Sequence, residues 1–313
     1  MKVKDIKWKE GATASELVER LGEVGFQGTE LRKAADIIAE MKRNNAKIYL
    51  TFTSNMVTSG LRGLFAQVIG LGLADVVVTT TGGIEEDIMK ALGEDFLIGR
   101  YKSDDVGLHE KGINRVGNLM ITNESYARFE DYVLPTLKKI YEKNKRVAAT
   151  ELLREIGLRL DDEDSILCQA ARKGVPIFCP TIADGSLGFH LYMFQQDHSD
   201  FTVDVIRDYA NLLASSSFDD KKGVIALGGG VSKHHAIFGI LLNGGCDYAV
   251  YMTTSHEHSG SMGGATTSEA KTWGKVKVDA NEAMIIGDVS ITFPMVISRA
   301  LDTMKKEGLI GDE

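Results

Sequence analysis

The chain has 313 residues, 43% of them hydrophobic and 26% charged, which is enough apolar material for one large core. Its formal net charge of −8 argues against a non-specific nucleic-acid binder, which needs clustered Lys and Arg to neutralise phosphates. No stretch approaches the roughly 20 apolar residues of a membrane span, and the cysteines form no CxxC motif. We therefore expect a cytoplasmic protein that binds neither nucleic acid nor membrane.

Residues 1–45 form a short helical segment in this interpretation. Thr13 and Glu16 have the spacing of a capping box, and apolar residues from Leu31 to Met41 recur at helical intervals. The chain has four prolines and no Pro/Ser-rich linker or repeat. We therefore expect a single domain over residues 1–313.

Short β-rich runs then alternate with helical patterns along the chain. We expect strands at residues 48–52, 75–80, 175–179, 223–227, 248–253 and 284–286. We expect helices at residues 61–70, 125–144, 150–157, 202–215, 233–242 and 291–306. This alternation predicts an α/β fold with a mainly parallel sheet and helices on both faces.

Five of the expected strands run into small or polar residues at their carboxyl ends. These ends are Thr53-Ser54-Asn55, Thr80-Thr81-Gly82-Gly83, Pro180-Thr181, Gly228-Gly229-Gly230 and Thr253-Thr254-Ser255. Ligands bind along this edge of an open parallel sheet, so the five ends together outline one extended site.

Two of these ends allow both a functional and a structural interpretation. Gly228-Gly229-Gly230 precedes a helix, so it could approach a pyrophosphate or simply form a tight turn, since it does not match GxGxxG. Glu85-Glu86-Asp87 opens the next helix in this interpretation, where the acids either cap the helix or bind a ribose hydroxyl and a cationic substrate.

Histidines occur in two clusters. His234 and His235 follow the three glycines, where one ring can face the site while the other packs. His256-Glu257-His258 resembles a metal ligand set, but adjacent residues rarely converge on one metal and no spaced third ligand stands out. We therefore expect these three to be solvated loop residues, and we expect no metal site.

Lys275 lies in Trp273-Gly274-Lys275, between the glycine-rich residues 260–264 and a strand-like run at residues 276–278. Most lysines are solvated, and propensity alone would place this one outside. Beside an indole and a flexible glycine it could instead be partly desolvated, which would supply the neutral amine that imine chemistry needs.

Seven stretches in register carry a resemblance to one family. They are Thr53-Ser54-Asn55, residues 80–87, residues 112–118, Asp184-Gly185-Ser186-Leu187-Gly188, residues 228–235, residues 247–251 and Trp273-Gly274-Lys275. From about residue 25 to about residue 296 the chain closely resembles deoxyhypusine synthase. The resemblance implies a Rossmann-like fold assembled as a homotetramer, with active sites between paired subunits and NAD at the strand ends.

The resemblance also implies roles for individual residues. Lys275 and His234 are implied as catalytic. The implied cofactor contacts are Ser54, Asn55, Met56, Val57, Thr58, Thr80, Thr81, Gly82, Asp184, Gly229, Thr254, Ser255, Asp288 and Val289. The implied substrate-binding residues are Glu85, Glu86, Gly260, Ser261, Glu269 and Trp273.

The reaction implied by the resemblance is aminobutyl transfer from spermidine to a lysine of the translation initiation factor 5A precursor. Spermidine gives a hydride to NAD, the resulting imine loses 1,3-diaminopropane, and Lys275 captures the four-carbon unit before it passes to the acceptor. Two alternatives stay open: a homospermidine synthase-like or other polyamine-modifying paralogue with an altered amine, and an NAD-binding homologue without polyamine turnover.

Three positions depart from the family pattern. Phe189 and Met262 stand where the usual member has aspartates that bind the amine, and Phe238 stands where an asparagine is common. Loss of a carboxylate that faces a desolvated ammonium can cost several kcal/mol. The departures therefore imply either the same substrate held differently or a changed amine donor or acceptor.

Overall fold

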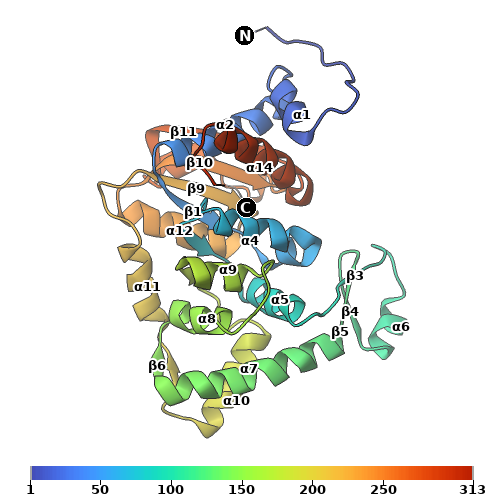
Figure 1. The fold of residues 1–313 in the computed structure, drawn as a ribbon, viewed down its shortest axis with the longest axis vertical. Helices are drawn as coiled ribbons and strands as arrows, with labels where there is room; N and C mark the ends of the chain where they lie inside the picture. The colour runs from blue at the N-terminus through green and yellow to red at the C-terminus, as the bar shows by residue number, and fades with distance from the viewer. Residues whose placement is uncertain (1, 312–313) are drawn as a thin grey trace. The chain divides into compact units, whose positions relative to one another are not determined.

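The structure is a computed structural model that describes residues 2–311 (Figure 1). These residues form two compact units that interleave along the chain. The first unit comprises Met1–Phe52, Leu71–Val78 and Ala210–Glu313, and the second comprises Thr53–Gly70 and Thr79–Tyr209. The single domain expected over residues 1–313 stays a prediction.

The first unit contains a parallel sheet. Its strands are β1 (Lys47–Thr51), β2 (Val76–Val78), β9 (Lys222–Leu227), β10 (Cys246–Thr253) and β11 (Val276–Ile286). They lie in the order β11-β10-β9-β1-β2, and every neighbouring pair is parallel. All six residues of β9 are buried, so this strand lies at the centre of the core and not at its surface.

Helices cover both faces of this sheet. The helices of this unit are α1 (Ala14–Leu21), α2 (Gln27–Arg43), α12 (Gly230–Leu242), η2 (Glu257–Ser259), α13 (Thr267–Thr272) and α14 (Val289–Lys306). In β10, Tyr251 lies under Lys233 of α12, whereas burial and the nearby Glu40 of α2 raise the pKa of Tyr248. Residues three apart in a strand point to opposite faces, so α12 and α2 pack on opposite faces.

The second unit is built mainly from helices. These are α3 (Ser54–Met56), η1 (Val57–Leu61), α4 (Arg62–Gly70), α5 (Thr81–Ala91), α6 (Asp105–Glu110), α7 (Asn123–Lys143), α8 (Ala149–Gly157), α9 (Ile166–Lys173) and α10 (Ser186–Asp197). The helix α11 (Val205–Ala214) begins in this unit and ends in the first. The strands of the second unit are β3 (Leu97–Ile98), β4 (Ile113–Val116), β5 (Leu119–Thr122), β6 (Arg146–Val147), β7 (Ile177–Phe178) and β8 (Thr202–Val203).

A buried ion pair fastens the helices of the second unit together. The Nε of Arg62 in α4 donates to Asp87 of α5 at 2.6 Å, and Arg62 also pairs with Asp162. Asp87 accepts further hydrogen bonds from the Ser165 hydroxyl and the Leu167 N–H, both at 2.8 Å, at the start of α9. One carboxylate therefore joins α4, α5 and α9.

The expected α/β class and parallel sheet are confirmed, and so is the capping box of Thr13 and Glu16.

The helix expected at residues 202–215 is wrong at its start. The N–H groups of Thr202 and Asp204 donate to main-chain oxygens of Lys145 and Val147, which makes β8 a strand paired with β6. The antiparallel sheet of β3, β5 and β4 was not expected, because its short strands lack a clear apolar period.

The capping role expected for Glu85-Glu86-Asp87 on their own helix is wrong. The helix α5 begins at Thr81 with Thr80 as its N-cap, which places the three acids beyond its first turn. Unpaired N–H groups exist only in the first turn of a helix, so these carboxylates have no such groups of α5 to accept from.

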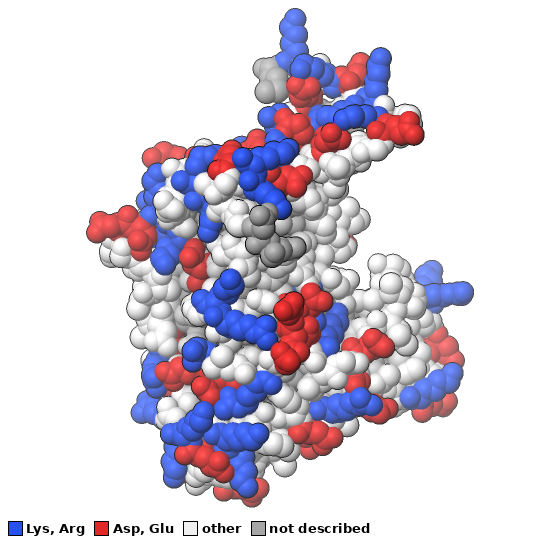
Figure 2. All heavy atoms as spheres, viewed as in Figure 1, with Lys and Arg blue, Asp and Glu red and all other residues white. Residues whose placement is uncertain are grey.

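Two features concern binding to nucleic acid and to membranes: the pattern of surface charge and the apolar length of the helices. On the face shown in Figure 2, basic and acidic side chains are intermixed, so this face carries no extended patch of one sign. Between residues 2 and 311, no helix is both long enough and apolar enough to cross a membrane.

Candidate active site

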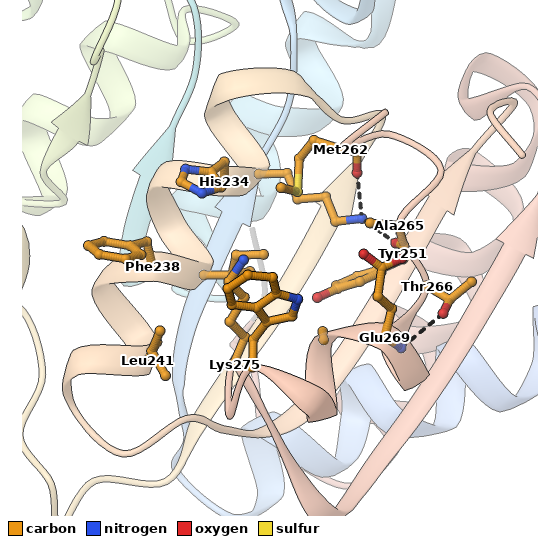
Figure 3. A pocket seen from close by; sticks show the side chains of 13 residues that line it. His234, Phe238, Leu241, Tyr251, Met262, Ala265, Thr266, Glu269 and Lys275 are labelled. Carbon is orange, nitrogen blue, oxygen red and sulfur yellow. Dashed lines mark hydrogen bonds between the residues drawn. The ribbon is translucent and has the colours of Figure 1, made fainter. Parts of the chain in front are cut away.

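A pocket of about 270 Å³ lies in the first unit, between α12 and the segment that runs through α13 to β11. Figure 3 shows side chains from these elements pointing into a common space. The pocket is lined by Lys233, His234, Ile237, Phe238, Leu241, Tyr251, Met262, Ala265, Thr266, Glu269, Ala270, Trp273 and Lys275. Six residues singled out from the sequence are therefore brought together here: His234, Phe238, Met262, Glu269, Trp273 and Lys275.

Lys275 enters this pocket from a tight turn just before β11. Gly274 has a φ of 71°, in the left-handed region that glycine adopts readily, and the Lys275 N–H donates to the Ala270 oxygen at 3.0 Å. Lys275 is 8% exposed, and its Nζ lies 5.1 Å from the centre of the Trp273 ring. Propensity alone would place this lysine outside, but in the structure its side chain is buried.

His234 faces the pocket from the second turn of α12. Its ring stacks on Phe238, with centroids 5.8 Å apart and 16° between the planes. Burial, and then the nearby Lys275, lower the pKa of His234 below its ordinary value of 6.5. The imidazole is therefore mostly neutral at pH 7 and able to accept a proton. Burial lowers the pKa of the neighbouring His235 to about 4.

Lys233 is a buried cation that sequence reasoning did not single out, although it lies within the quoted residues 228–235. It is 1% exposed, and its Nζ donates to the main-chain oxygens of Met262 at 3.1 Å and Ala265 at 2.8 Å. The same Nζ lies 3.9 Å from the ring centre of Tyr251, and burial lowers the pKa of Lys233 to about 8. Lys233 therefore stays mostly protonated at pH 7 and ties residues 262–265 to α12.

The three glycines after β9 form a tight turn in close contact with another glycine-rich loop. Gly228 and Gly230 have φ values of 77° and 67°, which favour glycine. A Cβ added to Gly229 would lie 2.2 Å from the Cα of Gly263, so main chain meets main chain at this point. The tight turn is therefore present, and close packing is a sufficient reason for Gly229.

Several implied cofactor contacts of the first unit follow neighbouring parallel strands. Gly229 follows β9, Thr254 and Ser255 follow β10, and Asp288 and Val289 follow β11. Because β9, β10 and β11 are adjacent and parallel, these residues lie along one edge of the sheet. The helices α12 and α14 begin at the same edge, and helix N-termini after parallel strands are suited to bind a phosphate or dinucleotide.

A second cluster gathers implied contacts within the second unit. The Ser54 N–H donates to the Thr80 hydroxyl at 3.1 Å, and a Cβ on Gly82 would lie 2.9 Å from the Cβ of Ser54. The Thr58 hydroxyl donates to Glu86 at 2.5 Å. Among the other implied contacts, Asn55 is exposed, whereas Met56, Val57 and Thr81 are buried.

Glu85 and Glu86 are adjacent buried acids with different surroundings. A Glu85 oxygen accepts from the Leu187 N–H at 2.7 Å, in the first turn of α10, so Glu85 caps this later helix. Asp184 lies just before this turn and is exposed. Burial raises the pKa of Glu86 to about 7, and Thr58 and Lys90 only partly offset that effect. Glu86 is therefore close to half protonated at neutral pH.

Other candidates lie outside the pocket lining. Gly260 and Ser261 belong to the loop that precedes Met262, and the Ser261 hydroxyl accepts from the Gly264 N–H at 3.3 Å. His256 to His258 lie at the exposed helix η2. Phe189 belongs to α10 of the second unit and is 57% exposed. Within residues 2–311 no three His, Cys, Asp or Glu side chains gather to hold a metal ion.

Comparison with known proteins identifies a family. The model of the deoxyhypusine synthase family matches residues 16–300. Two relatives named probable deoxyhypusine synthase are 39% identical over 291 residues, from Halobacterium salinarum, and 36% identical over 305 residues, from Schizosaccharomyces pombe. These alignments cover 92% of this chain in both cases, and 88% and 87% of the respective relatives.

A solved structure is similar over nearly the whole chain. The protein is from Entamoeba histolytica and is described as a deoxyhypusine synthase. It is 25% identical, covers 96% of this chain and 97% of its own, and superposes with a TM-score of 0.70. A family match over most of the sequence, together with similar relatives that span the same length, shows that this chain belongs to the deoxyhypusine synthase family.

Proposed function

We propose that the protein is an NAD-dependent transferase of the deoxyhypusine synthase type, with Lys275 as the carrier of the aminobutyl group of spermidine. The position of the Lys275 amine carries this proposal: it is 8% exposed, in a pocket of about 270 Å³, beside Trp273. An amine must be uncharged to attack, and the imine that it forms must be shielded from water. The burial of Lys275 in a pocket favours the second condition.

The other pocket residues supply matching roles. A bound NAD would accept the hydride that leaves the carbon beside the secondary amine of the donor. His234, mostly neutral at pH 7, takes the proton released from that amine. The Nζ of Lys275 attacks the resulting substrate imine, and 1,3-diaminopropane leaves. Trp273 forms a wall for the aliphatic chain, and Glu269 attracts an ammonium end.

NAD fits the residues that follow β9, β10 and β11. The helix α12 presents its N-terminus after a glycine turn that leaves room for a phosphate at Gly230, where an added Cβ would meet no atom within 4 Å. Asp288 caps α14 through the Ser290 N–H at 2.8 Å, and its carboxylate can also accept from a ribose hydroxyl. For Ser54, Thr80, Gly82 and Asp184 of the second unit, contact with the cofactor is proposed from the family resemblance alone.

The proposed partners follow from the family. The acceptor is a lysine of the translation initiation factor 5A precursor in the cytoplasm. The proposed assembly is a homotetramer with active sites between subunits. Glu85 and Glu86 are buried acids of the second unit, and for them contact with spermidine is proposed from the family resemblance alone.

A transfer assay tests the proposal. Purified protein, NAD and spermidine labelled in the butyl portion are incubated with the factor 5A precursor or with putrescine, and the label is followed. Label in the precursor supports deoxyhypusine synthesis, whereas label in homospermidine supports a homospermidine synthase-like activity. No NAD-dependent cleavage of spermidine would refute both.

Replacement of Lys275 tests the carrier directly. Lys275→Ala should reduce transfer to background while NAD binding, measured by calorimetry, changes less than about threefold, because the residue provides the nucleophile rather than the cofactor site. Lys277→Ala is a matched control, since Lys277 lies two residues later and pairs with Asp247 at 2.7 Å, away from the pocket lining. Full transfer by Lys275→Ala would contradict the assigned role.

A second candidate function is favoured by one observation. Phe238 and Met262, at two of the three positions that depart from the family pattern, both line the pocket that contains Lys275. The same transfer chemistry with a different amine is therefore the second candidate.

A further inference from the structure

The pocket has two walls that are distant from each other in the sequence. The helix α12 contributes His234 to the lining, whereas residues 262–275, the 262–275 segment, contribute Met262, Glu269, Trp273 and Lys275. In the proposed reaction the imine forms where His234 takes a proton, and the Nζ of Lys275 must reach it there. Transfer therefore depends on how the 262–275 segment is held against α12.

One side chain of α12 holds the 262–275 segment at its start. The Nζ of Lys233 donates to the main-chain oxygens of Met262 at 3.1 Å and Ala265 at 2.8 Å, and Figure 3 draws both hydrogen bonds as dashed lines. The same Nζ lies 3.9 Å from the ring centre of Tyr251. An ammonium has three N–H groups, and these three neighbours account for them. Lys233 is therefore engaged by the protein itself and has no N–H group left for a donor.

The tie made by Lys233 reaches Lys275 through α13. Ala265 is followed at once by Thr266, whose hydroxyl caps the start of α13. At the other end of this helix the Lys275 N–H donates to the Ala270 oxygen at 3.0 Å. The helix α13 has only six residues, and a helix of that length is held in place by its surroundings rather than by its own stability. The ammonium of Lys233 thus fixes the start of a short element that leads directly into the nucleophile.

Water cannot replace this ammonium. Lys233 is 1% exposed, so its removal would leave two main-chain oxygens of the 262–275 segment without their buried donor. The segment would then settle where these oxygens find other donors. A displacement of about 1 Å between reacting groups can lower a rate by about 100-fold, so a small movement of Lys275 is enough to impair transfer.

We propose that Lys233 is a positioning residue for the transfer, whose ammonium holds the 262–275 segment so that the Nζ of Lys275 reaches the donor imine. This inference rests on the proposed imine chemistry at Lys275 and adds a residue that acts through the segment rather than on the donor. It leaves spermidine as the donor, with the aminobutyl group as the unit carried by Lys275.

A misplaced Lys275 has a chemical consequence that can be measured. After hydride transfer to NAD, the spermidine imine has two fates. If Nζ adds to the imine carbon, the C–N bond to 1,3-diaminopropane breaks, the Nζ hydrogen leaves with this amine, and Lys275 keeps the four-carbon unit as an imine. If water adds instead, the products are 1,3-diaminopropane and 4-aminobutanal. Borohydride converts the Lys275 imine into a stable aminobutyl group.

The capture ratio is the amount of aminobutyl-Lys275 formed for each 1,3-diaminopropane released in a single turnover without acceptor. Peptide mass spectrometry of the borohydride-treated protein gives the first quantity, and chromatography of the supernatant gives the second. Partial unfolding lowers both quantities together and leaves their ratio unchanged. The capture ratio therefore reports the position of Lys275 and not the fraction of folded protein.

The chain offers a matched control in Lys222. This lysine is 0% exposed, and its Nζ donates to the main-chain oxygens of Ser217 and Asp220, both at 2.7 Å, but it does not line the pocket. Lys222→Met and Lys233→Met each remove a buried ammonium from two main-chain acceptors. We expect Lys233→Met to lower the capture ratio at least about tenfold, whereas Lys222→Met should keep the wild-type ratio.

The outcomes separate this inference from the proposed function. An unchanged capture ratio in Lys233→Met, or an equal decrease in both variants, would overturn the role of Lys233 and leave the proposed function intact. If Lys233→Met does not fold, Lys233→Gln decides by the same criterion, because it keeps two N–H donors on a side chain one atom shorter. No release of 1,3-diaminopropane by the wild type would overturn the proposed function and the role of Lys233 with it.

Discussion

Glu86 should make the stability of the protein fall as pH rises from about 4.5 to about 7. Burial raises the pKa of Glu86 from its ordinary 4.5 to about 7, although Thr58 and Lys90 favour its charged form. Over this interval the folded protein holds a proton that the unfolded chain has released, so the free energy of unfolding must decrease with pH. The decrease is about 1.4 kcal/mol for each pH unit at most.

The size of the total effect follows from the same two values. The gap between 4.5 and about 7 corresponds to about 3 kcal/mol, which is present below pH 4.5 and lost above pH 7. Glu86→Gln removes the titration but keeps an oxygen that can accept from the Thr58 hydroxyl, now 2.5 Å from the carboxylate. The variant should therefore be more stable than the wild type at pH 8 and similar to it at pH 4.5.

Urea unfolding at a series of pH values measures this difference directly. The quantity to plot is the wild-type free energy of unfolding minus that of Glu86→Gln, because other titrating groups then cancel. Asp161→Asn is a suitable control, since Asp161 is fully exposed and should leave the wild-type dependence unchanged. A pH-independent difference between wild type and Glu86→Gln would refute the reasoning.

Two further replacements test the packing that positions the site. Asp87→Asn should lower the free energy of unfolding in urea by about 3 kcal/mol, because Arg62 stays buried and keeps only the carboxylate of Asp162 as its partner. Asp162→Asn should lower it by about 1 kcal/mol, since Asp162 is partly exposed. Equal effects would contradict the buried role of Asp87. Gly229→Ala should lower the free energy of unfolding by about 1–3 kcal/mol, because the added Cβ would lie 2.2 Å from the Cα of Gly263. The same variant should bind NAD more weakly in calorimetry. Unchanged affinity and stability would contradict the close approach of the two glycines.

Local sequence signals predicted much of the fold of the first unit. The apolar runs that became β1, β9 and β10 are continuous and bounded by small residues, and parallel buried strands have this pattern. The spacing of Thr13 and Glu16 fixed the start of α1, since a cap depends only on residues within one turn. Short or exposed strands such as β3 and β8 have no such signal, and their pairing partners are distant in the chain.

The candidate site was predictable in its residue types but not in its environment. Trp273-Gly274-Lys275 indicated a candidate nucleophile, and the resemblance brought His234 and Glu269 to it. The sequence could not decide whether Lys275 was solvated, nor whether Met262 and Phe238 faced it, because both depend on how α12 packs against a loop far along the chain. Lys233 was missed for the same reason, since its two acceptors are main-chain oxygens.

The sequence by itself determined the strand and helix pattern, the glycine turn after β9 and the family of the chain, since each depends on local spacing or on motifs in register. Only the tertiary structure decided that Lys275 is buried, that burial raises the pKa of Glu86 to about 7 and that Phe238 and Met262 line the same pocket as Lys275. Burial, desolvation and the chemistry of a pocket wall belong to residues that meet across the fold, and a linear pattern does not specify which residues meet.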